Sequence, residues 1–342
     1  MSGWGFDVEP LYAVLLVFGW AFSVTIILLY AYIRVATRRG WVARDAHKVE
    51  EKYVADKGGI VLFLMPLIIA PLITIGGVDT HVCIVFILST SIGALVGLID
   101  DFRDLGLLKA GFVMAAGVPI LLFGLYNPRP YIPFLGTTRM FIVYPLFVLI
   151  LFSVFADACN MVDIYNGILV GQGLAVLLAL FGFSIIYGAW ESTFIIIVGI
   201  AYSLAFLVWN MYPASVFHGN VGAYGYGAML SCIVILVARE IPGAEFVAVI
   251  ALLPTIYNGF IYVFNTRFSP RASIEEDRRS NFFVDGYLVA NRNPNAVVNL
   301  SRLLLLHGKL NEKQMIVLYY TMFIVSSVLA FITGIFLFYR II

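Results

Sequence analysis

Two adjacent aspartates, Asp100 and Asp101, stand at the end of a strongly apolar stretch, and Lys109 follows them. Adjacent carboxylates point in different directions, so one can bind a metal ion while its neighbour orients a lysine or a nucleophile. Mg²⁺ prefers oxygen ligands and takes one or two carboxylates, with water and substrate phosphates completing its shell. The pattern therefore favours metal-assisted phosphate chemistry. The alternatives are that the acids only end a helix and that Lys109 is an interfacial anchor.

A second polar segment, residues 157–167, carries Asn160, Asp163 and Asn166 at intervals of three. If this segment is helical, the three oxygen-bearing side chains share one face. Such a face is able to hold a metal ion or a nucleotide. The alternative is a set of helix caps and turn residues, for which Asn166-Gly167 is well suited.

A third segment contains His218-Gly219-Asn220, a glycine-rich turn that opens the next apolar stretch. Backbone N–H groups at the start of a helix, together with the helix dipole, attract anions. The turn is therefore a candidate phosphate site. Glycines near it can equally reflect close packing of membrane helices.

Basic residues gather in two long polar stretches, and the guanidinium group of arginine matches phosphate oxygens well. The first stretch holds His47, Lys48 and Lys57-Gly58-Gly59, and the second holds Arg267, Arg271, Arg278 and Arg279. The alternative is the ordinary excess of positive charge on cytoplasmic loops.

The stretches that must position these residues are strongly apolar. The chain has 342 residues, of which 62% are apolar and 12% charged, against about 45–50% and about 25% in soluble domains. A bilayer core about 30 Å thick needs about 20 apolar residues per helix. Stretches of roughly this kind, free of internal charges, occupy residues 11–33, 58–76, 82–99, 110–125, 140–156, 168–189, 193–209, 221–238, 246–264 and 315–339. We predict an all-α, polytopic integral membrane protein with about ten transmembrane helices and one domain over residues 1–342.

This composition excludes a soluble enzyme, a disordered chain and a disulfide scaffold. The net charge of +1 argues against a nucleic-acid partner, which needs a strong basic field. Cys83, Cys159 and Cys232 are scattered, and we expect them to be apolar filler.

The loops differ sharply in basic residues. Of the 21 lysines and arginines, 17 fall in the loops 34–57, 100–109, 157–167, 210–220 and 265–314, and 4 fall on the opposite side. Positive loops stay in the cytoplasm, so we predict external termini and a cytoplasmic active site with two long cytoplasmic loops, 34–57 and 265–314. In the second loop, Asn293-Pro294 and the run 296–306 predict a short surface helix.

In this order and on one membrane face, the motifs resemble those of the polyprenyl-phosphate N-acetylhexosamine-1-phosphate transferase family. Asp100-Asp101 resembles its paired aspartates, and residues 160–167 resemble its asparagine-rich cytoplasmic motif. Residues 47–59 resemble its first cytoplasmic loop. Asn166-Gly167 before Gly171-Gln172, and residues 212–217 before Gly219, are more similar to the eukaryotic and archaeal UDP-GlcNAc:dolichyl-phosphate branch than to the bacterial phospho-N-acetylmuramoyl-pentapeptide transferase.

The resemblance implies transfer of N-acetylhexosamine-1-phosphate from a UDP-sugar, with UDP-GlcNAc favoured, to a polyprenyl or dolichyl phosphate with release of UMP. It implies a Mg²⁺ cofactor, for which Mn²⁺ substitutes, and a first membrane step of lipid-linked glycan assembly. The implied catalytic residues are Asp100, Asp101 and Lys109. The implied metal ligands are Asn160, Asn220 and Asp163, and the implied substrate contacts are His47, Lys48, Lys57, Asn166, Gly219, Arg267 and Arg271. Asn220 departs from the family, which usually has aspartate there, and the family's histidine-rich or Arg-His-Arg motif of the last loop is absent.

The implied location is the cell membrane of a prokaryote or the endoplasmic reticulum membrane of a eukaryote, and a homodimer is compatible with it. Alternative functions are a secondary transporter and the bacterial-type UDP-MurNAc-pentapeptide activity. Transporter sites tend to lie near the bilayer midplane between repeats, whereas these acids lie at one face and no repeat is visible. A non-catalytic scaffold would leave the clustered aspartates and asparagines unexplained.

Overall fold

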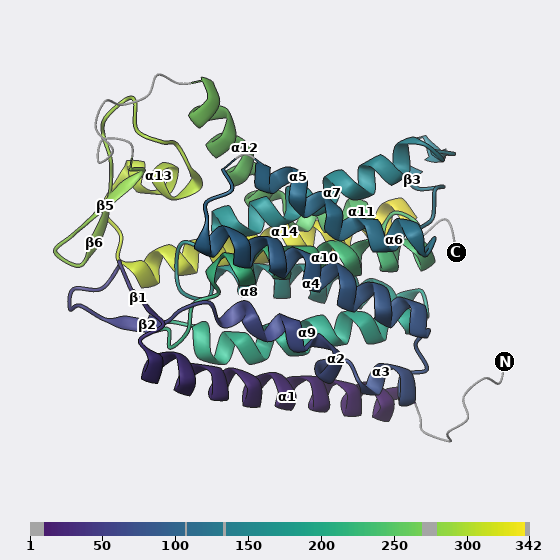
Figure 1. The fold of residues 1–342 in the computed structure, drawn as a ribbon. Helices are drawn as coiled ribbons and strands as arrows, with labels where there is room; N and C mark the ends of the chain where they lie inside the picture. Colours follow the sequence, from purple (N-terminus) through teal and green to yellow (C-terminus); the bar gives the residue numbers. More distant parts are fainter. Residues whose placement is uncertain (1–9, 107, 133–134, 269–278, 339–342) are drawn as a thin grey trace.

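The structure, a computed structural model, describes residues 10–106, 108–132, 135–268 and 279–338. Its long helices run roughly parallel and form a bundle (Figure 1). The first half contains α1 (Pro10–Arg39), β1 (Val42–Arg44), β2 (Tyr53–Ala55), the 3₁₀ helix η1 (Gly58–Leu64), α2 (Met65–Ile68), α3 (Pro71–Thr74), α4 (Thr80–Phe102), α5 (Leu108–Met114), η2 (Ala115–Gly117), α6 (Val118–Leu122), β3 (Tyr131–Ile132), β4 (Gly136–Thr137) and α7 (Val143–Val162). The second half contains α8 (Ile168–Ile186), α9 (Trp190–Asn210), α10 (Gly219–Glu240), α11 (Ala244–Ala251), α12 (Leu253–Phe268), β5 (Asn281–Val284), β6 (Tyr287–Ala290), α13 (Leu300–Leu304), η4 (Leu305–His307) and α14 (Glu312–Phe338).

Among the described residues, seven helices are long and apolar enough to cross a membrane: α1, α4, α7, α8, α9, α10 and α14. Helices α11 and α12 meet at a bend of 64° and together make an eighth candidate. The two remaining apolar stretches, Gly58–Thr74 and Leu108–Leu122, are shorter and are divided into short helices. The structure therefore supports seven or eight spans, and ten stays a prediction.

The fold is mostly helical, but the expectation of a purely α structure is wrong in detail. In the described part of the chain, β1 with β2, β3 with β4 and β5 with β6 form three antiparallel hairpins. The longest of these strands has four residues, which is too short for alternating polarity to be visible in the sequence.

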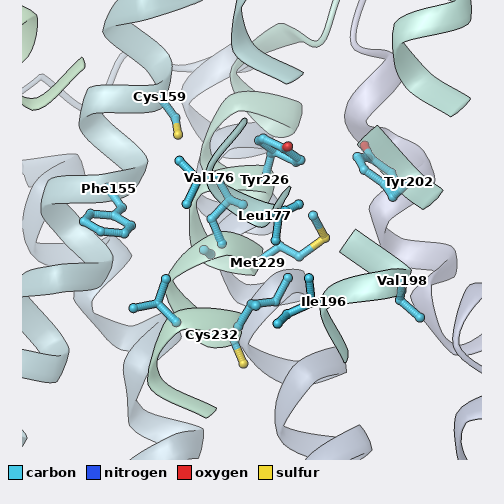
Figure 2. Close-up of a cluster of buried hydrophobic side chains, with 14 of the residues drawn as sticks. Phe155, Cys159, Val176, Leu177, Ile196, Val198, Tyr202, Tyr226, Met229 and Cys232 are labelled. Carbon is cyan, nitrogen blue, oxygen red and sulfur yellow. The ribbon is translucent and has the colours of Figure 1, made fainter. Parts of the chain in front are cut away.

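Helix α10 forms the centre of the bundle, and residues 221–238 of it are all buried. Its buried side chains pack with those of α7, α8 and α9, and Figure 2 shows this cluster around Val176, Leu177 and Met229. Cys159 and Cys232 belong to it. All three cysteines are free and buried, which confirms the prediction that they are apolar filler.

Glycine lets α4 approach the start of α10 very closely. A Cβ added to Gly97 would lie 2.1 Å from the backbone oxygen of Asn220, so no other residue fits there without a shift. This contact sets Asp100 and Asp101, one turn further along α4, beside the first residues of α10.

The two ends of the bundle differ. Hairpins β1–β2 and β5–β6 lie with α13 at one end, and β3 lies at the opposite end (Figure 1). The predicted surface helix in this region begins at Leu300 rather than near residue 296. Its cap is Asn299, whose side chain accepts a hydrogen bond from the N–H of Arg302. Leu300, Ser301 and Arg302 are buried, so α13 packs into the protein instead of lying on the membrane surface.

The arrangement predicts that the end with β1–β2 faces the cytoplasm. A cysteine replacing the exposed Glu51, between β1 and β2, should react with an impermeant maleimide only in inside-out vesicles. A cysteine replacing the exposed Thr137 in β4 should react in intact cells. The parent protein is the control, because its three cysteines are buried. Labelling of Glu51→Cys in intact cells would show that this end of the bundle faces the outside, contrary to the prediction.

Candidate active site

A polar cleft lies among three loops at the end of the bundle that carries β1 and β2. Its volume is about 250 Å³. It is lined by Arg44, Asp45, Ala46, His47, Asp56, Asn160, Asp163, Ile164, Tyr165, Asn166, Asn210, Phe217, Gly219 and Asn220. Three of the four predicted motifs therefore contribute to one cavity, although more than 170 positions separate Arg44 from Asn220 along the chain.

The paired aspartates have different partners. Asp100 accepts hydrogen bonds from Nδ2 of Asn220 at 2.9 Å and from Nζ of Lys109 at 3.3 Å. Asp101 accepts the backbone N–H groups of Asn220 at 3.0 Å and Val221 at 2.9 Å. Asp101 therefore caps the start of α10. A phosphate was expected at these N–H groups, but a carboxylate of the protein already binds them.

Beside Asp100, a second carboxylate reaches the same region from α7. Asp157 accepts a hydrogen bond from the hydroxyl of Tyr224 at 3.0 Å, and Nδ2 of Asn160 donates to that hydroxyl at 3.4 Å. The ammonium of Lys109 lies 6.0 Å from the ring of Tyr224. Tyr224 thus links Asn160 at the cleft to Asp157 and the neighbourhood of Lys109.

The expected helical face through Asn160, Asp163 and Asn166 is wrong, because α7 ends at Val162 and Asp163 is its C-cap. The three residues nevertheless line the same cleft. Oδ2 of Asp163 lies 3.3 Å from Nδ1 of the buried His218. Asn166 is 4% exposed and donates from Nδ2 to Asp45 at 3.3 Å, so its amide holds a turn rather than facing solvent.

The first loop is joined tightly to the turn before α10. The N–H groups of Gly58 and Gly59 donate to the backbone oxygens of Phe217 and His218 at 2.8 and 3.0 Å. Gly219 has φ +65°, and a Cβ there would lie 2.9 Å from Cα of Lys57. Only glycine suits this position, because both its backbone conformation and its surroundings exclude a side chain.

Lys57 keeps a positive charge at this junction. Its ammonium bonds Asp56 at 2.6 Å. Burial opposes the charge, but the hydrogen bond and charge of Asp56, with the charge of Asp101, raise the pKa of Lys57 overall. Lys57 is therefore a cation beside the cleft, paired with Asp56.

His47 lines the cleft, but not as a cation. Its ring lies 4.9 Å from that of Tyr165 and 6.2 Å from that of Phe283. Burial lowers its pKa to about 4, although Asp45 opposes the change. His47 is therefore neutral at pH 7, and its predicted role as a basic phosphate contact has no electrostatic support.

The lowered pKa of His47 makes the protein sensitive to acid. Because protonation favours the unfolded chain, this contribution to stability is complete above pH 6.5 and is lost as the pH falls toward 4. Between pH 7 and pH 5, the melting temperature of His47→Gln should therefore fall less than that of the parent. The exposed His81, substituted in the same way, is the control. Equal losses in His47→Gln and the parent would contradict the burial of a neutral imidazole.

Two predicted substrate contacts cannot be placed in the site. Arg271 lies outside the described residues, and Arg267 is in the last turn of α12, where its side chain is also outside them. Both stay predictions.

The cleft contains acids that sequence reasoning missed, chiefly Asp45 and Asp56. Both lie within the loop already selected for its basic residues, and each pairs with a nearby lysine. The alternation of acidic and basic residues in this loop of a mostly apolar chain was the sequence feature that could have indicated Asp45 and Asp56. Asn210 was also missed. It accepts the N–H of Gly167 at 3.1 Å and donates to the backbone oxygen of Val216 at 2.7 Å.

The donor set of the cleft fits a hard divalent cation. Asn160 and Asn220 each use their amide nitrogen on a protein partner, which leaves the amide oxygens available. Asp163 adds a carboxylate at the same cavity. Oxygen donors of this kind suit Mg²⁺, and the surrounding acids would otherwise repel a diphosphate.

The chain matches the family described as glycosyl transferase family 4 over residues 83–238. It is 26% identical over 319 residues to a Sulfolobus acidocaldarius protein named as a UDP-N-acetylglucosamine–dolichyl-phosphate N-acetylglucosaminephosphotransferase, covering 90% of this chain and 92% of that one. A Saccharolobus solfataricus protein of the same name is 26% identical over 317 residues, with 91% and 94% covered. The phospho-N-acetylmuramoyl-pentapeptide-transferase of Listeria innocua is 30% identical over 256 residues, with 67% and 77% covered. The resemblance seen in the motifs is confirmed, and the chain belongs to glycosyl transferase family 4 and is a transferase.

Proposed function

We propose that the protein transfers N-acetylhexosamine-1-phosphate from a UDP-sugar, with UDP-GlcNAc favoured, to a polyprenyl or dolichyl phosphate and releases UMP. The observation that carries the proposal is the cleft itself, where the first loop, the asparagine-rich turn and the start of α10 meet beside Asp100 and Lys109. The archaeal relatives named for this reaction cover 90% or more of the chain, which supports the dolichyl-type acceptor and UDP-GlcNAc.

In the proposed reaction, an oxygen of the lipid phosphate attacks the β-phosphorus of the UDP-sugar. A new P–O bond forms as the bond from the β-phosphorus to the oxygen bridging the α- and β-phosphates breaks, and UMP leaves with that oxygen. A phosphate monoester has its second pKa near about 6, so the nucleophile is largely ionised and needs no strong base. The residues must position two anions and neutralise them, as is general in phosphoryl transfer.

Lys109 is placed to act on the lipid side. Its ammonium is held by Asp100, and its neighbours on α5, Leu108 and Phe112, expose 69% and 51% of their surface. Apolar side chains beside a cation suit a ligand with a charged head and a hydrocarbon tail. We therefore assign the acceptor phosphate to Lys109 and the nucleotide sugar to the cleft.

Asn160, Asn220 and Asp163 would hold Mg²⁺ in the cleft. When bound, the ion supplies positive charge for the diphosphate oxygens. Lys57 adds a second positive charge at the junction of the first loop and Gly219. We propose a cytoplasmic site and external termini, because the basic loops share one end of the bundle with the cleft. We also propose ten spans, which requires that the bent α11–α12 pair and the shorter apolar stretches Gly58–Thr74 and Leu108–Leu122 each cross the membrane.

The rival class, a secondary transporter, would need a site near the bilayer midplane. Here the candidate site lies where the helices end and the loops begin, which favours the enzyme.

Purified protein should be mixed with Mg²⁺, a lipid phosphate and one UDP-sugar at a time. We expect UMP with UDP-GlcNAc and an isoprenoid phosphate, and none when the lipid is omitted. UMP only with UDP-MurNAc-pentapeptide would instead assign the bacterial-type activity. The absence of UMP from every combination would contradict the transferase proposal.

A further inference from the structure

Two segments that are distant in sequence meet in a buried ionic cluster beside the cleft. Asp45 and Lys48 come from the loop between β1 and β2, and Glu312 is the first residue of α14. The side chains of Asp45, Lys48 and Glu312 are 2%, 11% and 3% exposed. Burying an unpaired charge is costly, so the stability of this Asp45–Lys48–Glu312 cluster depends on how its charges are paired.

Lys48 is the only cation in the cluster among the described residues. Its ammonium lies 2.9 Å from Oδ2 of Asp45, pairs with Oε2 of Glu312 and lies 4.4 Å from the ring centre of Tyr212. Two carboxylates against one ammonium leave a net negative charge.

A metal ion is not required by this cluster. Ligand atoms of Asp45, His47 and Glu312 lie within 4.8 Å of one another, a spacing that a cation can fill. The ammonium of Lys48 already binds both carboxylates, so the positive charge that the acids need is present.

The cluster is attached to both walls of the cleft. Asp45 belongs to the wall formed by the first loop, and it accepts a hydrogen bond from Asn166 of the opposite wall. The next residue, Gly167, accepts a hydrogen bond from the hydroxyl of Tyr320 on α14 at 2.9 Å. Lys48 thus joins the first loop to the same helix that supports the asparagine-rich turn.

We propose that Lys48 is a positioning residue, which fixes the separation of the two cleft walls through Asp45 and Glu312 and does not bind a substrate phosphate. Residues 44–47 line the cleft, whereas Lys48 does not. Its ammonium is directed to two carboxylates and an aromatic face of the protein. This inference rests on the proposed function for the identity of the ligand in the cleft.

The decisive test is rescue by a second substitution. Lys48→Met leaves two adjacent buried carboxylates without a cation, and breaking a buried pair in this way is strongly unfavourable. We expect KM for the UDP-sugar to rise about ten-fold or more, with kcat within about three-fold of the parent. Adding Glu312→Gln returns the net charge of the cluster to that of the parent and leaves Asp45 bonded to Asn166. The double variant should therefore recover a KM within about three-fold of Glu312→Gln alone.

The opposite result has a clear meaning. If Lys48 binds the substrate, Glu312→Gln cannot replace its charge, and the double variant will be as impaired as Lys48→Met. That outcome, or a loss confined to kcat, would overturn the proposal. If Lys48→Met does not fold, the same comparison uses Lys48→Gln with and without Glu312→Gln.

A second readout does not depend on catalysis. Hydrogen–deuterium exchange of residues 160–167 should become faster in Lys48→Met and return toward the parent rate in the double variant. Glu245→Gln is the matched control, because Glu245 is 3% exposed and lies in the first turn of α11, away from the cleft. An inactive parent would contradict the proposed function, while unchanged exchange in Lys48→Met would contradict the positioning role.

Discussion

Asp100→Asn and Asp101→Asn should each lower turnover about ten-fold or more, which corresponds to at least about 1.4 kcal/mol in the activation barrier. For Asp100, the reason is the loss of the charge that holds Lys109 and Asn220. Its substitution is nearly isosteric, so the melting temperature should stay close to that of the parent. For Asp101, the reason is the loss of the anionic acceptor of two N–H groups at the start of α10. A lost helix cap costs about 1 kcal/mol, so this variant should also melt at a lower temperature.

UMP release and thermal melting in detergent measure both effects. Asp104→Asn is the control, since Asp104 is exposed and bonds only the N–H of Gly106 among the described residues. If both Asp100→Asn and Asp101→Asn turn over like the parent at saturating Mg²⁺, the two aspartates have no catalytic role and only end a helix.

Asn220→Leu should lose activity about a hundred-fold or more, because it removes an oxygen ligand of the cleft together with the donor to Asp100. Asn220→Asp should remain active, with its Mg²⁺ dependence shifted to lower concentration, because an anionic ligand is added. The structure adds a second consequence. The new carboxylate would replace an amide that now lies 2.9 Å from Asp100, and neighbouring like charges repel. Asn220→Asp should therefore melt at a lower temperature without Mg²⁺ and recover when the ion is added.

These results separate a metal ligand from a helix cap. Asp101, and not Asn220, caps the first N–H groups of α10, so a capping role for Asn220 has no support in the geometry. Asn127→Asp is the control. Asn127 lies between α6 and β3, and its amide oxygen accepts a hydrogen bond from the N–H of Arg129. An unchanged Mg²⁺ titration in Asn220→Asp, together with an active Asn220→Leu, would remove Asn220 from the site.

Membrane-spanning character was predictable because about 20 consecutive apolar residues have few alternatives to a bilayer. Proline limited the accuracy of the count. Pro66 and Pro71 both lie within the predicted span 58–76, yet each occupies the first turn of a separate short helix, α2 and α3. Proline fits the first turn of a helix better than its interior, so the break follows from local chemistry.

The membership of the site was more predictable than the partners of its residues. The three-residue spacing of oxygen-bearing side chains singled out Asn160 and Asp163, and the family resemblance singled out Asn220. All three line the cleft. Their bonds depend on tertiary contacts such as Asn166 with Asp45, which are 121 positions apart. No local pattern reveals that Asp101 caps another helix or that Lys48 forms an ion pair with Glu312.

Local ambiguity explains the misplaced helix in the last loop. Asn293 and Asn299 are both suitable caps by residue type. Asn293 instead accepts the N–H of Asn295 in a tight turn, while Asn299 accepts that of Arg302 and starts α13. The buried guanidinium of Arg302 bonds the backbone oxygens of Asn291, Asn293 and Ala296. These three bonds, to acceptors 6 to 11 positions earlier in the same loop, fix its course, and backbone acceptors carry no sequence signature.

The fate of the β-phosphorus of the sugar nucleotide distinguishes transfer of a phosphosugar from transfer of the sugar alone. UDP-GlcNAc labelled with ³²P at the β-phosphate should be incubated with the purified protein, Mg²⁺ and a polyprenyl phosphate. We predict that the label enters the lipid fraction in an amount equal to the UMP released. Release of labelled UDP, with sugar but no label in the lipid, would mean that the protein transfers the sugar alone and would contradict the proposed phosphosugar transfer.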